Sequence, residues 1–281
     1  MKREGVSGTM LTDIPFRLLS TYLIYIIMGV KFSLHEGSEH QNRESPAHHT
    51  RHNTNEMKVI NLGDRSSVIN CHMAQLRDIN IQGNRTLFRR NLERIARAMA
   101  YEVSRTLDYS DKTITTPLGT KDVPTYDDRI VVGTVLRAGL AFHEGFLDTF
   151  DQADSAFVAA FREEGGSREE MKIHVQYIAA PDLNGCTFLM VDPMLATGGS
   201  LELSYKAFLS HGTPKKLHIC CAISSQEGID HLCRVFPDDD VTLWVAAVDP
   251  KLNEDAYIVP GLGDAGDLSF GPKLGLPANL K

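Results

Sequence analysis

Apolar residues recur along this chain with two different spacings. Between residues 84 and 107 they follow a helical period, for example at Phe88, Leu92 and Ile95, while arginines occupy the opposite face. This pattern predicts one long amphipathic helix. Its arginine face could bind an anion, although a solvated or subunit-facing surface is the commoner outcome for such a face.

Beyond residue 128, short apolar runs alternate with segments of helical spacing. The expected strands are residues 130–136, 157–162, 173–179, 187–191, 217–223 and 241–247. The expected helices follow at about residues 139–149, 199–210 and 226–235. Such alternation predicts an α/β fold with a mostly parallel sheet, helices on both faces, and ligands at the carboxyl ends of the strands.

Residues 1–56 do not share this pattern. The mostly apolar run at residues 18–30 is too short to span a bilayer comfortably. Its length would suit a signal peptide, but Glu4 and Asp13 lie in the flank that should be basic, and no small-x-small cleavage site follows. Residues 36–56 are polar and rich in histidine, which is typical of disorder. We predict that residues 1–56 are a disordered or non-native extension and that residues 57–281 form the functional domain.

Charge limits the possible partners. The formal net charge of the 281-residue chain is −7, which argues against a nucleic-acid or anionic-membrane partner, because both need a broad basic face. A chain with this balance that binds a polyanionic substrate must confine its positive charge to a few placed arginines. The histidines of residues 36–56 could bind a metal, but they lack cysteine partners and regular spacing.

The five cysteines form no C-x-x-C pair and show no metal-binding spacing. Cys186, Cys220 and Cys221 lie in apolar, strand-like runs. We therefore expect buried free thiols in a reducing compartment, which places the protein in the cytoplasm.

The strongest chemical signal is the segment Val191-Asp192-Pro193-Met194-Leu195-Ala196-Thr197-Gly198-Gly199-Ser200. An apolar strand ends in a carboxylate, breaks into a glycine-containing loop and continues as a helix. This order directs backbone N–H groups and the positive end of a helix dipole at a phosphate. Asp192 could then hold the hydroxyls of a sugar attached to that phosphate. The alternative is an ordinary strand-to-helix turn.

Two arginines follow other expected strands. Arg137 begins the segment Arg137-Ala138-Gly139-Leu140, in which the glycine would let the backbone approach an anion that the guanidinium holds. Arg162 ends the next strand and could likewise hold an anion. The alternative is a surface ion pair with Glu163 or Glu164, which follow it in the sequence.

Residues 256–267 contain four glycines or prolines between other residues and should form a shaped loop. The segment has no histidine, cysteine or other dedicated nucleophile, so it reads as a binding element. A loop of this kind presents bare N–H and C=O groups, which can recognise the hydrogen-bonding edge of a flat base.

These four segments resemble, in order, those of the uracil phosphoribosyltransferases, which are type I phosphoribosyltransferases that use 5-phosphoribosyl 1-pyrophosphate (PRPP). Most type I relatives carry a second acid after the first, where this chain has Pro193, and that departure is itself typical of the uracil enzymes. The resemblance implies a type I phosphoribosyltransferase-like parallel sheet with a small C-terminal hood over the base site, and residues 57–281 would then be the phosphoribosyltransferase domain.

The resemblance also assigns roles residue by residue. Catalytic roles fall to Arg137, Asp192 and Asp264. Uracil-binding roles fall to Ile258, Gly263, Asp264 and Ala265. PRPP-binding roles fall to Arg137, Arg162, Asp192, Pro193, Met194, Leu195, Ala196, Thr197, Gly198, Gly199, Ser200 and Asp264.

The activity implied is the conversion of uracil and PRPP to uridine monophosphate (UMP) and diphosphate, with Mg²⁺ bound mainly through PRPP. The family forms dimers and tetramers, and GTP activates some members. The alternatives are a PRPP-binding regulatory protein without turnover, a phosphoribosyltransferase for another base such as a purine or orotate, and a structural or scaffold protein.

Removal of the predicted extension tests the domain boundary. A chain that starts at Met57 should fold and turn over like the full chain, because no site motif precedes that residue. Circular dichroism and steady-state kinetics on both chains are the measurements. Insolubility, or a rate loss of more than about tenfold, equivalent to about 1.4 kcal/mol, would show that residues 1–56 have a structural role.

Overall fold

The computed structural model describes residues 57–162, 173–236 and 240–273, with the side chains of 160–162 and 173–176 left out. The predicted extension at residues 1–56 lies outside these ranges. The description below concerns the domain that they form.

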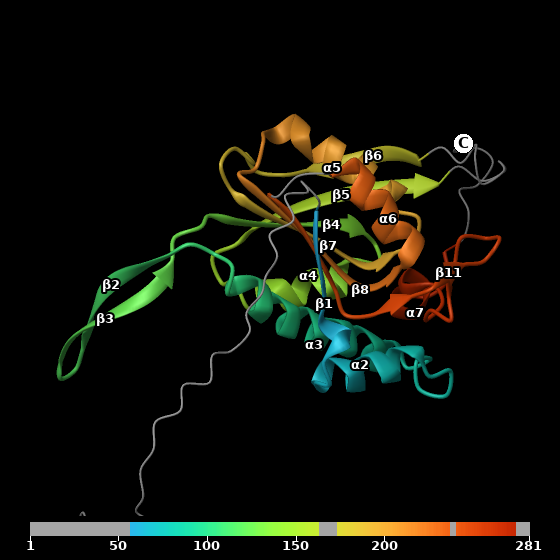
Figure 1. Ribbon diagram of the computed structural model, residues 1–281, viewed down its shortest axis with the longest axis horizontal. Coiled ribbons are helices and arrows are strands. Elements are labelled where there is room, and N and C mark those ends of the chain that lie inside the picture. The colour runs from blue at the N-terminus through green and yellow to red at the C-terminus, as the bar shows by residue number, and fades with distance from the viewer. Residues whose placement is uncertain (1–56, 163–172, 237–239, 274–281) are drawn as a thin grey trace, which may run out of the picture. The chain divides into compact units, whose positions relative to one another are not determined.

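A central sheet organises the described domain (Figure 1). Its strands run in the order β1 (Lys58–Asn61), β9 (Val241–Val245), β8 (Lys216–Ser225), β7 (Thr187–Leu195), β4 (Ile130–Leu136), β5 (Asp154–Arg162) and β6 (Ile173–Ala179), and β10 (Val248–Asp249) pairs with the end of β8. Every pairing in this sheet is parallel except that between β5 and β6. The predicted α/β class with a mostly parallel sheet is confirmed.

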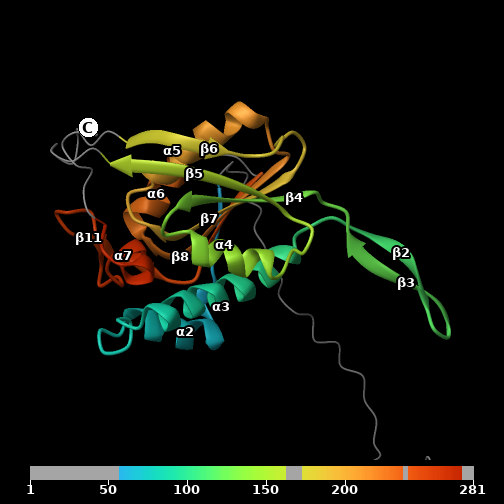
Figure 2. The same cartoon turned by 180° about the vertical axis from the view of Figure 1, so that it is seen from behind.

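Helices cover both faces of the sheet, as Figures 1 and 2 show from opposite sides. One face carries α2 (Val68–Arg77), α3 (Arg85–Ser104) and α4 (Leu140–Leu147). The other face carries α5 (Gly199–Phe208), followed by the short 3₁₀ helix Leu209–His211, and α6 (Gln226–Val235). A further 3₁₀ turn, Leu62–Asp64, joins β1 to α2.

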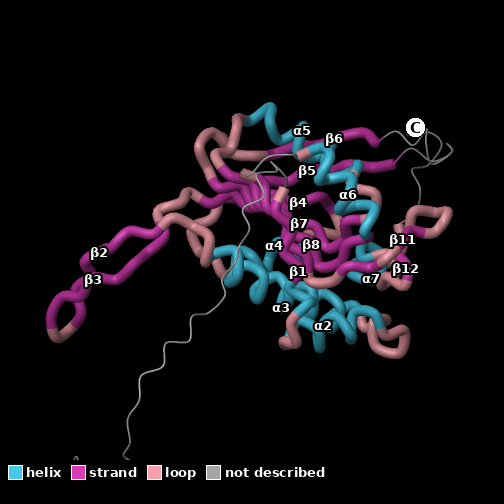
Figure 3. Tube along the Cα trace, in the orientation of Figure 1, coloured by secondary structure: helices cyan, strands magenta, loops and turns pink. Residues whose placement is uncertain are grey.

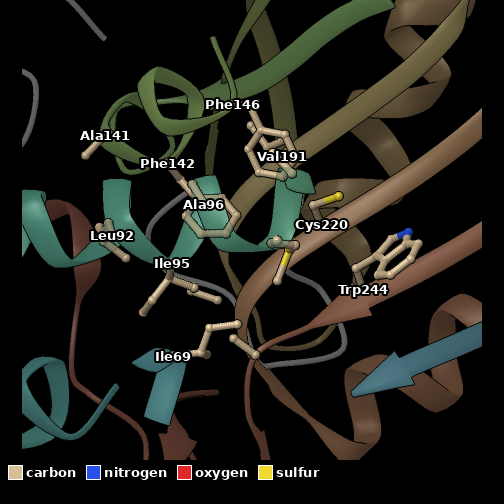
Figure 4. Close-up of a cluster of buried hydrophobic side chains, with 14 of the residues drawn as sticks. Ile69, Leu92, Ile95, Ala96, Ala141, Phe142, Phe146, Val191, Cys220 and Trp244 are labelled. Atoms are coloured by element: carbon tan, nitrogen blue, oxygen red, sulfur yellow. The ribbon is translucent and has the colours of Figure 1, made fainter. Parts of the chain in front are cut away.

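The apolar face of α3 forms the centre of one core layer. Leu92 and Ile95 of this helix are fully buried, together with Phe142 and Phe146 of α4 and Val191 of β7 (Figure 4). Each buried side chain of this size stabilises the fold by about 1.5–3 kcal/mol relative to an exposed one. The predicted helical spacing between residues 84 and 107 therefore follows from contact with α4 and the sheet.

The arginine face of α3 has several partners. Arg90 and Arg97 form ion pairs with Glu93, and Arg97 also pairs with Asp148. Arg89 contacts the C-terminal part of the domain, where its Nη1 donates a 2.5 Å hydrogen bond to the carbonyl of Ser269. This face is thus partly a solvated surface and partly a support for the chain's C-terminal elements.

A hairpin that the apolar pattern did not predict leaves the sheet between α3 and β4. Its strands β2 (Tyr109–Thr116) and β3 (Gly119–Tyr126) are antiparallel, and every residue of β2 is exposed. Figure 3 shows the hairpin projecting away from the helices and the central sheet. Because neither face of β2 is buried in the chain, its sequence carries no alternation of apolar and polar residues.

The C-terminal elements lie at the edge of the sheet where β4, β7 and β8 end (Figure 1). They comprise the short antiparallel pair β11 (Lys251–Leu252) and β12 (Ile258–Val259), and the helix α7 (Ala265–Phe270). We call residues 251–271 the C-terminal hood. The expected loop at residues 256–267 is thus bounded by a short strand and the start of a helix.

Strand β7 is longer than the predicted strand at residues 187–191. It pairs with β4 only as far as Val191 but continues on β8 to Leu195. Pro193 therefore lies in a strand with a partner on one side only, which is the position where a sheet tolerates a residue without an N–H group. Asp192 accordingly lies within β7 rather than at its end.

Cys186, Cys220 and Cys221 are buried and free of disulfide bonds, as predicted. Burial raises the pKa of Cys186 to about 11 and those of Cys220 and Cys221 well above their usual value. Within the described ranges, no helix is both long and apolar enough to cross a membrane.

Candidate active site

The candidate site lies where two neighbouring strands lead into helices on opposite faces of the sheet. Strands β4 and β7 are neighbours, but β4 leads into α4 on one face and β7 leads into α5 on the other. In open α/β sheets, ligands bind outside the carboxyl ends of strands at such a switch point. The segments beginning at Arg137 and Asp192 both lie at this point.

Asp192 is a carboxylate in an apolar setting. Its register partner on β8 is the buried Cys221, and its Oδ1 accepts a 3.0 Å hydrogen bond from the N–H of Met194. Burial raises the pKa of Asp192 to about 7, and the Met194 hydrogen bond only partly opposes this rise. At neutral pH the side chain is therefore divided between its neutral and charged forms.

The turn after β7 is short. It contains Ala196 and Thr197, and Gly198 caps the N-terminus of α5 with φ +85°. A side chain at Gly198 would also lie 2.7 Å from Cδ2 of His231 on α6. No side chain caps α5 at this end, so the helix dipole and the N–H groups of its first turn are available to an anion.

The last two residues of β8 support this turn. Ser225 Oγ donates a 2.6 Å hydrogen bond to the carbonyl of Ala196 and accepts one of 2.9 Å from the N–H of Gly228. Ser224 Oγ lies 3.3 Å from the carbonyl of Leu195 and donates to it. The sequence could have suggested Ser225 as an N-cap, because a serine often precedes a helix. Its hydrogen bond to Ala196, 29 residues away along the chain, could not have been predicted from the sequence.

A second contact fixes the helix that follows the turn. His231 Nε2 on α6 lies 2.8 Å from Oε2 of Glu202 in the first turn of α5. Together with the close approach of His231 to Gly198, this contact holds the start of α5 against α6. The neighbouring strand and helix therefore determine the orientation of residues 196–200, which we call the candidate anion-binding turn.

Among the sequence-predicted residues 193–195, Pro193 and Leu195 are buried and Met194 is partly buried. The side chain of Leu195 packs in the core with Leu201 and Ile229. These three residues are the last of β7 and lead the chain into the turn. Residues 196–200 form the turn itself and the uncapped start of α5.

Arg137 follows β4 and reaches toward the C-terminal hood. Its Nη2 lies 3.3 Å from Oδ1 of Asp267 and 3.4 Å from the carbonyl of Gly271. Both charged side chains remain well exposed, at 42% for Arg137 and 38% for Asp267. An exposed ion pair of this kind contributes at most about 1 kcal/mol, so an anion can displace Asp267 readily.

Gly139 has a packing role, because a side chain at this position would collide with Oγ1 of Thr134. Its expected role in letting the backbone approach an anion stays a prediction. The residue is the N-cap of α4, and its small size lets that helix pack directly on the end of β4.

Arg162 is the last residue of β5, and its backbone pairs with Ile173 of β6. Because β5 runs parallel to β4, both strands end at the same edge of the sheet. Its side chain lies outside the described atoms, so its assignment to PRPP stays a prediction.

The residues assigned to the base lie in the hood. Ile258 is buried in β12, Gly263 is exposed with φ +89°, and Ala265 is buried at the start of α7. Asp264 caps α7 by accepting a 2.9 Å hydrogen bond from the N–H of Asp267. The hood contacts the loop after β4, since a side chain at Gly266 would lie 3.8 Å from Cβ of Ala138.

The model of the uracil phosphoribosyltransferase family matches residues 64–272, which includes all four segments. The chain belongs to the uracil phosphoribosyltransferase family.

Relatives and a solved structure agree with this family membership. A uracil phosphoribosyltransferase of Porphyromonas gingivalis is 48% identical over 218 residues, which are 78% of this chain and all of that protein. One from Thermococcus gammatolerans is 37% identical over 208 residues, 73% of this chain and 90% of that protein. The structure of a protein from Aquifex aeolicus is 30% identical, with a TM-score of 0.68, and covers 76% of this chain and 98% of that one. The resemblance derived from the four motifs is confirmed.

The partly buried carboxylate of Asp192 leads to a stability prediction for this member of the uracil phosphoribosyltransferase family. Because the folded-state pKa of Asp192 is raised, ionisation between about pH 4 and pH 7 destabilises the fold, and the penalty persists above pH 7. Asp192→Asn keeps the acceptor for Met194 and removes the charge. It should raise the free energy of unfolding by about 1–3 kcal/mol at pH 8 and by much less at pH 5.

Urea denaturation at the two pH values measures this difference. Isothermal titration with PRPP on the same samples should show weaker binding by the variant. A variant that is destabilised equally at both pH values would mean that the Asp192 charge is well solvated.

Proposed function

We propose that this protein transfers the phosphoribosyl group of PRPP to uracil, which yields UMP and diphosphate and serves pyrimidine salvage. The observation that carries the proposal is the meeting of three elements at one switch point: the open N-terminus of α5, Arg137 after β4, and the C-terminal hood that contacts Arg137. Each element matches a segment of the family to which the chain belongs.

In the proposed reaction, N1 of uracil attacks the anomeric carbon of the ribose as the bond to the pyrophosphate oxygen breaks. Positive charge develops on the ribose, and N1 loses its proton. The assigned segments supply no dedicated covalent nucleophile. Catalysis would therefore come from holding both substrates in line and from stabilising the departing diphosphate.

Each end of PRPP has a proposed partner. Backbone N–H groups of residues 196–200 would hold the 5-phosphate, and Asp192 would accept hydrogen bonds from the ribose hydroxyls. Arg137 and Arg162 would bind the pyrophosphate, with Asp264 also contacting PRPP. The pyrophosphate carries more charge than a single carboxylate, which favours its replacing Asp267 beside Arg137.

The base would be recognised by Ile258, Gly263 and Ala265, largely through backbone groups. Gly263 supports this assignment, because it is exposed and a Cβ built there would meet only Cδ1 of Leu268, at a contact distance of 3.6 Å. Its positive φ also disfavours any residue larger than glycine.

Magnesium fits this site as an ion held chiefly by the substrate. The described residues contain no group of three or more His, Cys, Asp or Glu side chains placed to hold a metal ion. Mg²⁺ keeps several waters and needs only one or two carboxylates when phosphates supply other ligands. When bound, it would neutralise charge on the leaving diphosphate. Asp192 would supply one such carboxylate.

We extend the proposal to a homo-oligomeric assembly, a dimer or tetramer, with GTP as an activator. The projecting hairpin supports self-association, because it exposes Ile114 and Leu118 beyond the body of the domain. Exposed apolar residues on a projecting element are typical of protein contacts.

Arg137→Ala tests the anion assignment. The loss of a charged donor that binds the departing pyrophosphate should raise the activation barrier by about 2–4 kcal/mol. Steady-state kinetics of UMP formation measure this effect. Arg105→Ala is the control, since Arg105 is exposed and pairs with Glu102 at the far end of α3. Equal kinetics for wild type and Arg137→Ala would place the pyrophosphate site elsewhere.

Competition between uracil and cytosine tests the base. Uracil offers an N–H donor flanked by two carbonyl acceptors, and cytosine replaces that N–H with an acceptor and one carbonyl with an amino donor. Fixed backbone groups cannot suit both patterns, and each unsatisfied buried group costs about 1–3 kcal/mol. We expect a preference for uracil of about a thousandfold or more when both bases compete for PRPP.

Product analysis with a panel that includes orotate and a purine completes the assay. Within it, Ile258→Val should leave the selectivity almost unchanged, while Gly263→Val should abolish binding of the base. Comparable use of uracil and cytosine by the wild type would contradict the uracil assignment.

A further inference from the structure

A charged pair joins the C-terminal hood to the rest of the domain. Arg77, the last residue of α2, donates from Nη1 to Oδ2 of Asp249 at 2.7 Å and from Nη2 to Oδ1 at 2.8 Å. Asp249, the last residue of β10, is 5% exposed. This is a bidentate guanidinium–carboxylate contact, the strongest geometry available to these two groups.

The pair binds both backbone polar groups of one residue of the hood. Arg77 Nη1 also donates a 3.0 Å hydrogen bond to the carbonyl of Gly261, and the N–H of Gly261 donates a 2.7 Å bond to Oδ2 of Asp249. Both backbone groups of Gly261 are therefore held by the same ion pair. Gln82 adds a 3.3 Å bond from its Nε2 to the carbonyl of Leu262.

Gly261 is suited to this position. Its φ is +62°, and a side chain there would collide with the carbonyl of Ile258. The residue stands between Ile258 and Gly263, which are both assigned to uracil. A fixed Gly261 thus determines the course of the backbone on each side of it.

Asp249 also connects the hood with the candidate anion-binding turn. It is the register partner of Ser225, whose hydroxyl bonds the carbonyl of Ala196. The two halves of the proposed site are therefore attached to adjacent strands β8 and β10 at the same register position. Burial by itself would raise the pKa of Asp249, but the hydrogen bonds from Arg77 and Gly261 lower it overall, so the carboxylate is charged at neutral pH.

We infer that Arg77 and Asp249 are positioning residues for base recognition: the pair fixes the backbone on both sides of the Gly261 Cα and thereby aligns the backbone groups of Ile258 and Gly263 with the edge of uracil. The inference rests on the proposed assignment of uracil to the hood. It assigns a role in specificity to two residues that do not themselves touch the base.

Three variants test this role. Arg77→Met keeps the length of the side chain and removes its donors, Asp249→Asn removes the charge, and Arg77→Lys keeps a charge without the planar fork. At saturating PRPP, the first two should raise the KM for uracil at least about tenfold, because each removes hydrogen bonds to a charged group. Arg77→Lys should give an intermediate value. The KM for PRPP should rise less than the KM for uracil, since Ser225 and the candidate anion-binding turn lie outside the hood and are unchanged.

Arg129→Met is the matched control. Arg129 also combines an ion pair, 3.2 Å to Asp154, with a 2.5 Å bond to the carbonyl of Asp182, but it lies at the amino ends of β4 and β5. Its loss should leave both KM values unchanged. The double variant Arg77→Met/Asp249→Asn should resemble the single variants within about threefold, since all three break the same contact.

The preference for uracil over cytosine separates a positioning role from a structural one. We expect this preference to fall at least about tenfold in Arg77→Met and Asp249→Asn. An unchanged KM for uracil and unchanged preference, with only a lower thermal unfolding midpoint, would overturn the inference. A failure of these variants to fold would also count against it, because the inference requires loosening of the hood with the sheet intact. A wild type that does not use uracil would refute the proposed function instead.

Discussion

The backbone pairing of β7 with β8 extends past the point where β4 ends, and the candidate site depends on that extension. Four residues, from Asp192 to Leu195, keep one hydrogen-bonded neighbour while their other side is free. The free side gives Asp192 access to the switch point. The paired side carries the chain to Ala196, where Ser225 holds the turn. If β7 paired with β8 over fewer residues, the position of the turn that begins at Ala196 would not be fixed by the sheet.

The same extension explains the electrostatics of the site. The strand places the Asp192 carboxyl in the setting of a sheet interior, opposite the buried Cys221, so its charge is poorly solvated before any substrate arrives. The charged form of this carboxylate therefore lowers the stability of the free protein. Arg137 shows the complementary arrangement, because its charge stays exposed and only weakly engaged by Asp267.

Sequence patterns predicted those parts of the fold that bury a regular apolar face. Strand β4 and helix α6 begin and end at the predicted residues because local spacing alone defines them. The β2–β3 hairpin was missed because its residues face solvent, and the end of β7 was misjudged because Pro193 reads as a strand break unless the neighbour on each side is known.

The site was predictable in the same uneven way. The motifs drew attention to Arg137, Asp192 and the hood, which the structure places at one edge of the sheet. The contacts that position them could not be predicted, since Arg77 and Asp249 are separated by 172 residues and a single sequence does not reveal which distant charges meet. The steric reason for Gly139 likewise depends on Thr134, whose side-chain position follows from packing.

The pairing of β1 with β9 has a consequence for the order of folding during synthesis. Lys58 at the start of the described domain is the register partner of Thr242, close to its end. Contacts between residues so far apart along the chain form late, because the intervening segment must first be made and ordered. The ribosome must therefore release almost the whole domain before the edge of the sheet can close. Until then, β1 and the side of β8 that β9 covers would be accessible to chaperones, and a chain truncated before residue 241 would lack the strand that receives β1.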